Sequence, residues 1–223
     1  MKISFSPEIA AAAPQMRVMV VEAAVHNGPT SDALWQEITA ACAALEGTPM
    51  EAVNKRPAIA ATRAAYKALG KDPNRYRPSA EALARRAVKG MELYRTTALV
   101  DLINLLSLRS GHSIGGFDAD AVDGDAIELG RGRAGEPYAA IGRGELNIDG
   151  LPVWRDATGG FGTPTSDNER TKMSPATSRL LMTVNIYGTS EAGDDAFEAE
   201  MRRLLEQYAG ATDIKITTHS PSR

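Results

Sequence analysis

The stretch that decides the fold is RTTALVDLINLLSLRSGHSIGGFD, from Arg95 to Asp118. Residues 98–108 are apolar almost all round a helical period, which predicts a central, buried helix. Thr97 is a suitable N-cap for this helix, and Gly111 marks its end. Beyond Gly111 the chain changes from helical patterns to short Gly-rich strands. Helices that precede strands in this way predict an α+β or layered ββα fold rather than an alternating parallel sheet.

The flanking segments fit the same layout. Residues 16–25 (MRVMVVEAAV) predict a strand buried on both faces, and Asp149-Gly150 between two apolar runs predicts a hairpin of residues 146–148 with 151–154. Residues 161–178 have the composition of a polar loop. Helices are also expected over residues 31–45, 58–69, 79–89 and 194–208, and strands over 2–6, 113–117, 126–129, 138–141, 180–187 and 213–217. We expect one domain, residues 1–223, because nothing in the middle is typical of a linker.

The charge is distributed unevenly. The chain of 223 residues has a formal net charge of −3, but residues 55–95 hold eleven Lys and Arg against three acidic residues. That window carries +8, so the rest of the chain carries −11. Phosphate binding depends on local cation density, so an acidic total does not exclude an RNA partner, although a solvated basic helix face would have the same composition. The residues expected to contact RNA are Arg75, Arg77, Arg85, Arg86 and Lys89, with Tyr66, Tyr76 and Tyr94 interleaved among the cations.

Several chemistries lack their motifs. The three histidines are far apart and Cys42 is the only cysteine, so neither a zinc site nor a disulfide framework is expected. The Gly-rich runs 130–133 and 142–144 lie between strands rather than before a helix, which argues against a Rossmann or phosphate-loop site. The N-terminus does not read as a signal peptide and no apolar run is long enough to cross a membrane, so we expect a cytoplasmic protein.

Two polar features remain as candidates for a site. Asp101 and Asn104 interrupt the apolar helix on one face, so they either satisfy backbone groups of a neighbouring turn or line a wet pocket. The loop TPTSDNERT, from Thr163 to Thr171, follows the Gly-rich run 159–162, which allows its backbone to approach a ligand. An ordinary solvated loop would have the same composition.

These residues resemble a known family. Val100-Asp101, Asn104, Gly111 and Phe117-Asp118 match, at the same spacing, a motif of the B3/B4 domain, the editing module in the β subunit of bacterial phenylalanyl-tRNA synthetase. Free-standing proteins built from this domain are similar over residues 71–86, 144–156 and 161–171. The resemblance is strongest over residues 55–190. It implies a three-layer ββα sandwich, in agreement with the pattern of elements above.

The resemblance also implies a site. In the synthetase the domain hydrolyses tyrosyl-tRNA made in error, and the matching positions give a pocket of Asn104, Gly115, Gly116, Phe117 and Thr183, with Asp101 in a structural role. Three positions depart from the family: Ile103 replaces a Thr, Gly115 replaces a His, and Thr183 lies where the family has a Glu. The glycines at positions 115 and 116 are expected to enlarge the pocket. Without the family His and Glu, we expect Glu169, Asn168 and Thr171 to position water, with no metal and no cofactor.

Three functions follow as hypotheses. The first is a trans-acting hydrolase of mischarged aminoacyl-tRNA, with tRNA on the basic window and the aminoacyl group in the pocket. The second is a non-catalytic module that binds tRNA or another structured RNA. The third is a protein that binds a small aromatic amino acid-like ligand in the same pocket, without RNA. Synthetase activity itself is not expected from a chain of this length.

Overall fold

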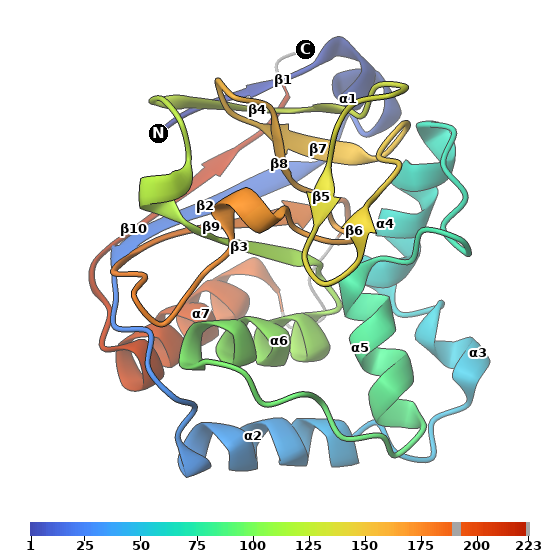
Figure 1. Ribbon diagram of the computed structural model, residues 1–223. Helices are drawn as coiled ribbons and strands as arrows, with labels where there is room; N and C mark the ends of the chain where they lie inside the picture. The colour runs from blue at the N-terminus through green and yellow to red at the C-terminus, as the bar shows by residue number, and fades with distance from the viewer. Residues whose placement is uncertain (189–192, 222–223) are drawn as a thin grey trace.

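The computed structural model describes residues 1–188 and 193–221 and shows two four-stranded sheets stacked on a layer of helices (Figure 1). The strands of the first sheet lie in the order β1 (Lys2–Phe5), β4 (Ala126–Arg131), β7 (Pro152–Arg155) and β8 (Gly160–Gly162). Those of the second lie in the order β10 (Thr212–His219), β2 (Arg17–Ala24), β9 (Arg179–Ile186) and β3 (Ile114–Asp118). A short ribbon pairs β5 (Ala139–Ala140) with β6 (Gly144–Glu145). The predicted α+β fold and its three-layer ββα sandwich are confirmed.

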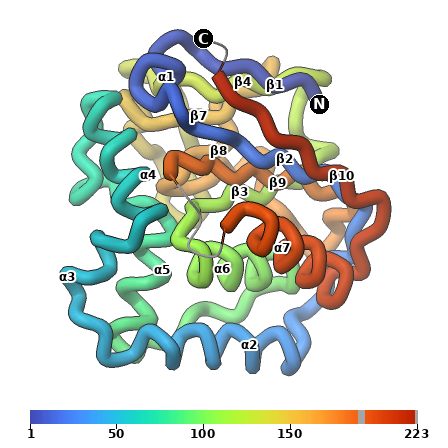
Figure 2. Tube along the Cα trace, turned by 180° about the vertical axis from the view of Figure 1, so that it is seen from behind, coloured from blue at the N-terminus to red at the C-terminus, as the bar shows by residue number. Residues whose placement is uncertain are grey.

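The helices cover the face of the second sheet that is turned away from the first. Helices α6 (Ala98–Ser110) and α7 (Asp194–Ala209) lie against this sheet, and α2 (Asp32–Ala43) packs beneath them (Figures 1 and 2). Helices α4 (Pro57–Ala68) and α5 (Ser79–Val88) stand at one side of the layers (Figure 1). The short elements are α1 (Pro7–Ala12), α3 (Met50–Val53) and the 3₁₀ turns η1 (Ala119–Ala121) and η2 (Glu169–Thr171). The helix layer therefore has a second tier below α6.

Strand β2 explains why the second sheet is sandwiched. Met19 and Val21 belong to the core between this sheet and the helices, whereas Val18 and Val20 belong to the core between the two sheets. Both faces of the strand are apolar, so it must be covered on both sides. This is the arrangement that the run MRVMVVEAAV predicts.

Asp101 fixes the start of the buried helix α6. Its carboxylate, 1% exposed, accepts hydrogen bonds from the hydroxyl of Thr30 and from both the backbone N–H and the hydroxyl of Thr96. The helix ends at Gly111, which has the positive φ of 75° that favours glycine. Asp101 is thus hydrogen-bonded inside the fold, so of the two polar residues on this helix face only Asn104 is left for a pocket.

The predicted hairpin of residues 146–148 with 151–154 is wrong. Asp149 and Gly150 do form a turn, but β7 pairs with β4 and β8, and residues 146–148 form no strand. The reason is a competing set of partners: the Lys71 ammonium donates to the carbonyls of Asn147 and Asp149, at 3.0 and 2.5 Å. A further departure is β8, which forms within the stretch expected to be a loop. In the part of the chain that the structure describes, no helix is long and apolar enough to cross a membrane.

Candidate binding cleft

A cavity of about 370 Å³ lies between α6 and the loop of residues 163–173, beside the edge strand β3. Its apolar wall includes Val100, Ile103, Ile114 and Met173. Its polar lining includes Thr97, Asn104, Asp167 and Lys172. An apolar pocket with a few converging polar groups is the usual form of a small-ligand site.

Two of these polar groups have no hydrogen-bond partner among the residues that the structure describes. The Thr97 hydroxyl oxygen is buried without a hydrogen bond. Asn104 lies two turns further along α6. Its side-chain amide makes no hydrogen bond within residues 1–188 and 193–221. A buried hydroxyl without a partner, such as that of Thr97, is costly, and a bound ligand or water would satisfy it.

Asp167 is the acidic residue of the cavity. Burial of its carboxyl raises its pKa from the ordinary 3.8 to about 8, although the backbone N–H groups of Gly116 and Thr163 lower it. The loop holds this residue in place: the Thr163 hydroxyl accepts from the backbone N–H of Ser166 at 3.0 Å, and the Asp167 carbonyl accepts from the N–H of Ile141 at 3.0 Å. A carboxyl that titrates near neutral pH in a cavity is a candidate acid–base group.

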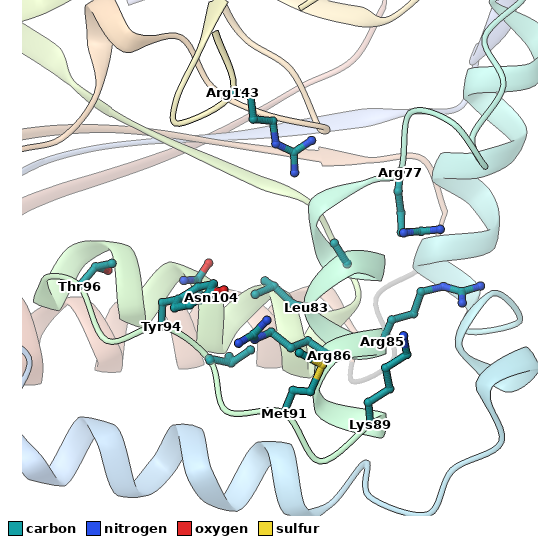
Figure 3. A pocket seen from close by; sticks show the side chains of 12 residues that line it. Arg77, Leu83, Arg85, Arg86, Lys89, Met91, Tyr94, Thr96, Asn104 and Arg143 are labelled. Atoms are coloured by element: carbon teal, nitrogen blue, oxygen red, sulfur yellow. The ribbon is translucent and has the colours of Figure 1, made fainter.

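A basic groove of about 540 Å³ runs along α5 and the segment that follows it (Figure 3). Five of its lining residues are cations and none of the described lining residues is acidic; the cations are Arg77, Arg85, Arg86, Lys89 and Arg143. Four of the five residues predicted to contact RNA therefore line one groove. The fifth, Arg75, lies outside it, with its guanidinium 5.5 Å from the ring of Tyr76.

The groove and the cavity adjoin each other. Thr96 and Asn104 line both of them. In Figure 3, Asn104, Thr96 and Tyr94 gather at one end of the groove, and Arg77, Arg85 and Lys89 lie at the other. A long ligand could thus lie along the cations and place its end in the cavity.

The cations of the groove differ in whether they form ion pairs. Glu81, which is fully buried, pairs with Arg85 at 2.9 Å and Arg77 at 3.4 Å, and outside the groove with Arg63 at 2.8 Å. Lys89 and Arg143 have no ion pair with a residue that the structure describes. The predicted basic helix face is partly a structural ion cluster, and the remaining positive charge is concentrated on the open groove.

The three residues predicted to position water line neither the groove nor the cavity. Glu169 accepts from the backbone N–H of Gly142 and pairs with Lys172 at 2.5 Å, and these contacts, the lysine first, lower the pKa of its carboxyl. Asn168 caps η2 by accepting from the backbone N–H of Arg170 at 2.9 Å. Thr171, fully buried, faces the carbonyl of Phe161. The loop does lie over the cavity, but these three side chains bind the backbone and side chains that hold the loop in place and do not face the cavity.

The predicted pocket residues divide between the two faces of the second sheet. Gly116 faces the cavity: an added Cβ would lie 2.4 Å from Ile103 Cδ1 and 2.8 Å from Met173 Cε. At Gly115 an added Cβ would lie 2.5 Å from Phe117 Cζ, between the sheets, where Thr183 is also buried. The expectation that both glycines enlarge one pocket is wrong, because neighbouring strand residues face opposite ways and the Phe117 ring already fills the space beside Gly115.

Two residues of the cleft were not expected from the sequence. Asp167 lies in the polar loop of residues 163–171, one residue before the predicted Asn168. No sequence pattern distinguishes it from Glu169, the other acidic residue of this loop. Arg143 belongs to the Gly-rich turn between β5 and β6, and its side chain points toward the groove (Figure 3). Among the described residues, no three His, Cys, Asp or Glu side chains are grouped to hold a metal ion.

Comparison with known proteins assigns the family. The B3/4 domain family model matches residues 61–201, which is more than half of the chain, so the chain belongs to the B3/4 domain family. An N-terminal fragment of the phenylalanyl-tRNA synthetase β-subunit from Pyrococcus horikoshii matches the structure with a TM-score of 0.48 and 15% identity. That match covers 96% of this chain and 50% of the fragment, so the chain spans half of the fragment's length. A search of curated proteins finds no significant match.

Proposed function

We propose that this B3/4 domain protein binds the end of an aminoacylated tRNA and hydrolyses the ester of a mischarged amino acid. The observation that carries the proposal is that the basic groove adjoins the cavity, with Thr96 and Asn104 lining both. The groove has the charge for a phosphate backbone, and the cavity has the size and lining for an amino acid side chain. Family membership supports a role connected with tRNA synthetases.

In the proposed reaction the Asp167 carboxylate takes a proton from water, whose oxygen attacks the ester carbonyl. The carbon–oxygen bond to the ribose then breaks, and the ribose oxygen takes up the proton from Asp167. The Asn104 amide, which lines the same cavity, would donate to the developing oxyanion. A base with a pKa of about 8 suits a reaction near neutral pH, and such a group typically contributes about 10²–10⁴-fold in rate.

The second candidate is a module that binds RNA without hydrolysis. It is favoured by the contacts of Glu169, Asn168 and Thr171, which serve the framework of the loop rather than the cavity. The groove would work equally well for this function, because phosphate contacts require only the cations.

Binding is tested by titrating the protein with tRNA at several salt concentrations. We expect affinity to fall steeply with salt, because each phosphate contact releases counterions. Arg86→Glu in the groove should abolish binding, whereas Arg75→Glu, the same charge reversal outside the groove, should reduce it only slightly. Equal effects of the two variants would contradict a groove-specific interaction.

Hydrolysis is tested by incubating the protein with a panel of mischarged aminoacyl-tRNAs and measuring the release of amino acid. Release from at least one member supports the hydrolase. Binding with no release from any member supports the non-catalytic module. Thermal stabilisation by a free amino acid, with no binding of tRNA, would instead favour a small-molecule protein.

A further inference from the structure

Exposed apolar side chains gather along the basic groove and the cavity beside it. In the part of the chain that the structure describes, the exposed large hydrophobic residues are Tyr94 (73% exposed), Met91 (45%) and Ile141 (40%). Tyr94 and Met91 line the basic groove, and Ile141 lines the cavity that continues it. Apolar surface left open beside concentrated charge marks an interaction site.

Tyr94 is part of a pre-arranged stack. The Arg86 guanidinium lies 4.3 Å from the centroid of its ring, and the Nε of Arg86 donates to the carbonyl of Glu92 at 2.5 Å. These contacts hold the arginine against the ring while most of the tyrosine surface stays exposed. By contrast, Tyr66 is fully buried and Tyr76 carries the Lys71 ammonium 3.7 Å from its ring centroid.

The position of this stack relative to the cavity suggests its ligand. Tyr94 precedes Thr96 by two residues, and Thr96 lines both groove and cavity. A base that stacks on Tyr94 would bring its own ribose to the mouth of the cavity. Lys89 and Arg143, in the same groove, would then face the phosphates that precede it.

We propose that Tyr94 and Arg86 form a stacking platform for the unpaired 3′-terminal base of the RNA, and that this platform places the terminal ribose at the mouth of the cavity. The inference rests on the proposed function and adds its positioning element. A single-stranded RNA end fits better than a duplex, because only an unpaired base offers its face to an aromatic ring. The groove's cations, with no acid among the described residues that line it, complement the RNA backbone.

The experiment uses tRNA with 2-aminopurine in place of its 3′-terminal adenine, because stacking quenches the fluorescence of this base. With the wild-type protein we expect quenching on binding. Tyr94→Ala should remove the quenching and weaken binding about tenfold, whereas Tyr94→Phe should keep both. Tyr94→Phe therefore serves as the matched control, because it keeps the ring and removes only the hydroxyl. Thermal unfolding of each variant checks that the fold is retained.

A second arm uses tRNA that lacks its terminal nucleotide. The wild type should bind it about as weakly as Tyr94→Ala binds intact tRNA, and Tyr94→Ala should discriminate little between the two. Binding of intact tRNA by the wild type, with unchanged quenching in Tyr94→Ala, would overturn the platform while leaving RNA binding in place. An absence of tRNA binding by the wild type, or preferential binding of an acidic peptide in the groove, would overturn the proposed function and the platform with it.

Discussion

Replacement of Asp167 by Asn tests the chemistry of the cavity. Asn has the shape of Asp and keeps an oxygen that accepts from the backbone N–H groups of Gly116 and Thr163, but it neither binds nor releases a proton near neutral pH. If Asp167 is the general base, Asp167→Asn should lower the rate of deacylation by about 10²–10⁴-fold with little change in tRNA affinity. The wild-type rate should rise with pH up to about 8, where the carboxyl ionises, and then level off.

The same substitution has a predictable effect on stability. The pKa of Asp167 is about 8 in the folded protein and close to 3.8 when the residue is exposed, so the folded state holds the proton more tightly. Its contribution to stability is fully present below pH 3.8 and is lost as the pH rises toward 8. Between pH 6 and pH 8 the loss is at most about 2 kcal/mol, which lowers the melting temperature of a chain of this length by about 5 °C. Asp167→Asn should lack this decrease.

Two measurements check the reasoning: thermal unfolding of both proteins between pH 5 and 9, and deacylation rates over the same range. The stability difference between wild type and variant should shift in favour of the variant as the pH rises. Parallel stability curves would refute the raised pKa of Asp167. If Asp167→Asn retains full activity and Glu169→Gln loses it, the carboxylate that acts on water is Glu169, one of the three residues that the sequence predicts to position it.

Two further predictions concern the framework of the cleft. Asp101→Ala should lower the free energy of unfolding in urea by about 2–4 kcal/mol, because it leaves the buried Thr30 hydroxyl and the two donors of Thr96 unpaired; a loss below about 0.5 kcal/mol would contradict this role. Gly116→Ala should impair ligand binding with a modest loss of stability, since the displaced Ile103 and Met173 ends are flexible and line the cavity. Gly115→Ala should instead cost about 1–3 kcal/mol of stability, because the Phe117 ring that it meets is packed edge-on against Phe161 at 4.8 Å; equal behaviour of the two variants would show that the glycines share one environment.

The layered fold could be predicted because its signals are local. Strand β2 has β-branched residues on both faces, and α6 is apolar all round. The sequence of each element therefore indicates by itself which of its faces are buried. The predicted hairpin at Asp149-Gly150 does not form because the partners of residues 146–148 come from elsewhere: the Lys71 ammonium donates to the carbonyl of Asn147, and the Leu146 N–H donates to the carbonyl of Tyr138. No pattern within that segment indicates a partner so distant along the chain.

The site was predicted only in part for a similar reason. The cations expected to contact RNA could be named because they are dense in the sequence around α5, and Asn104 could be separated from its apolar neighbours. Within the loop of residues 163–173, side-chain direction depends on its turns, such as the one that the Thr163 hydroxyl caps. Composition drew attention to this loop but pointed to Glu169, whereas the turn geometry brings Asp167 to the cavity.

The most direct test of the account is the release of amino acid from a panel of mischarged tRNAs by the purified protein and by Asp167→Asn. If Asp167 is the general base of a deacylase, the wild type should deacylate at least one member of the panel, with a rate that rises toward pH 8. The variant should bind the same tRNA but release amino acid about 10²–10⁴-fold more slowly. Binding of tRNA by the wild type without release from any member would contradict hydrolysis and leave the groove as an RNA-binding surface alone.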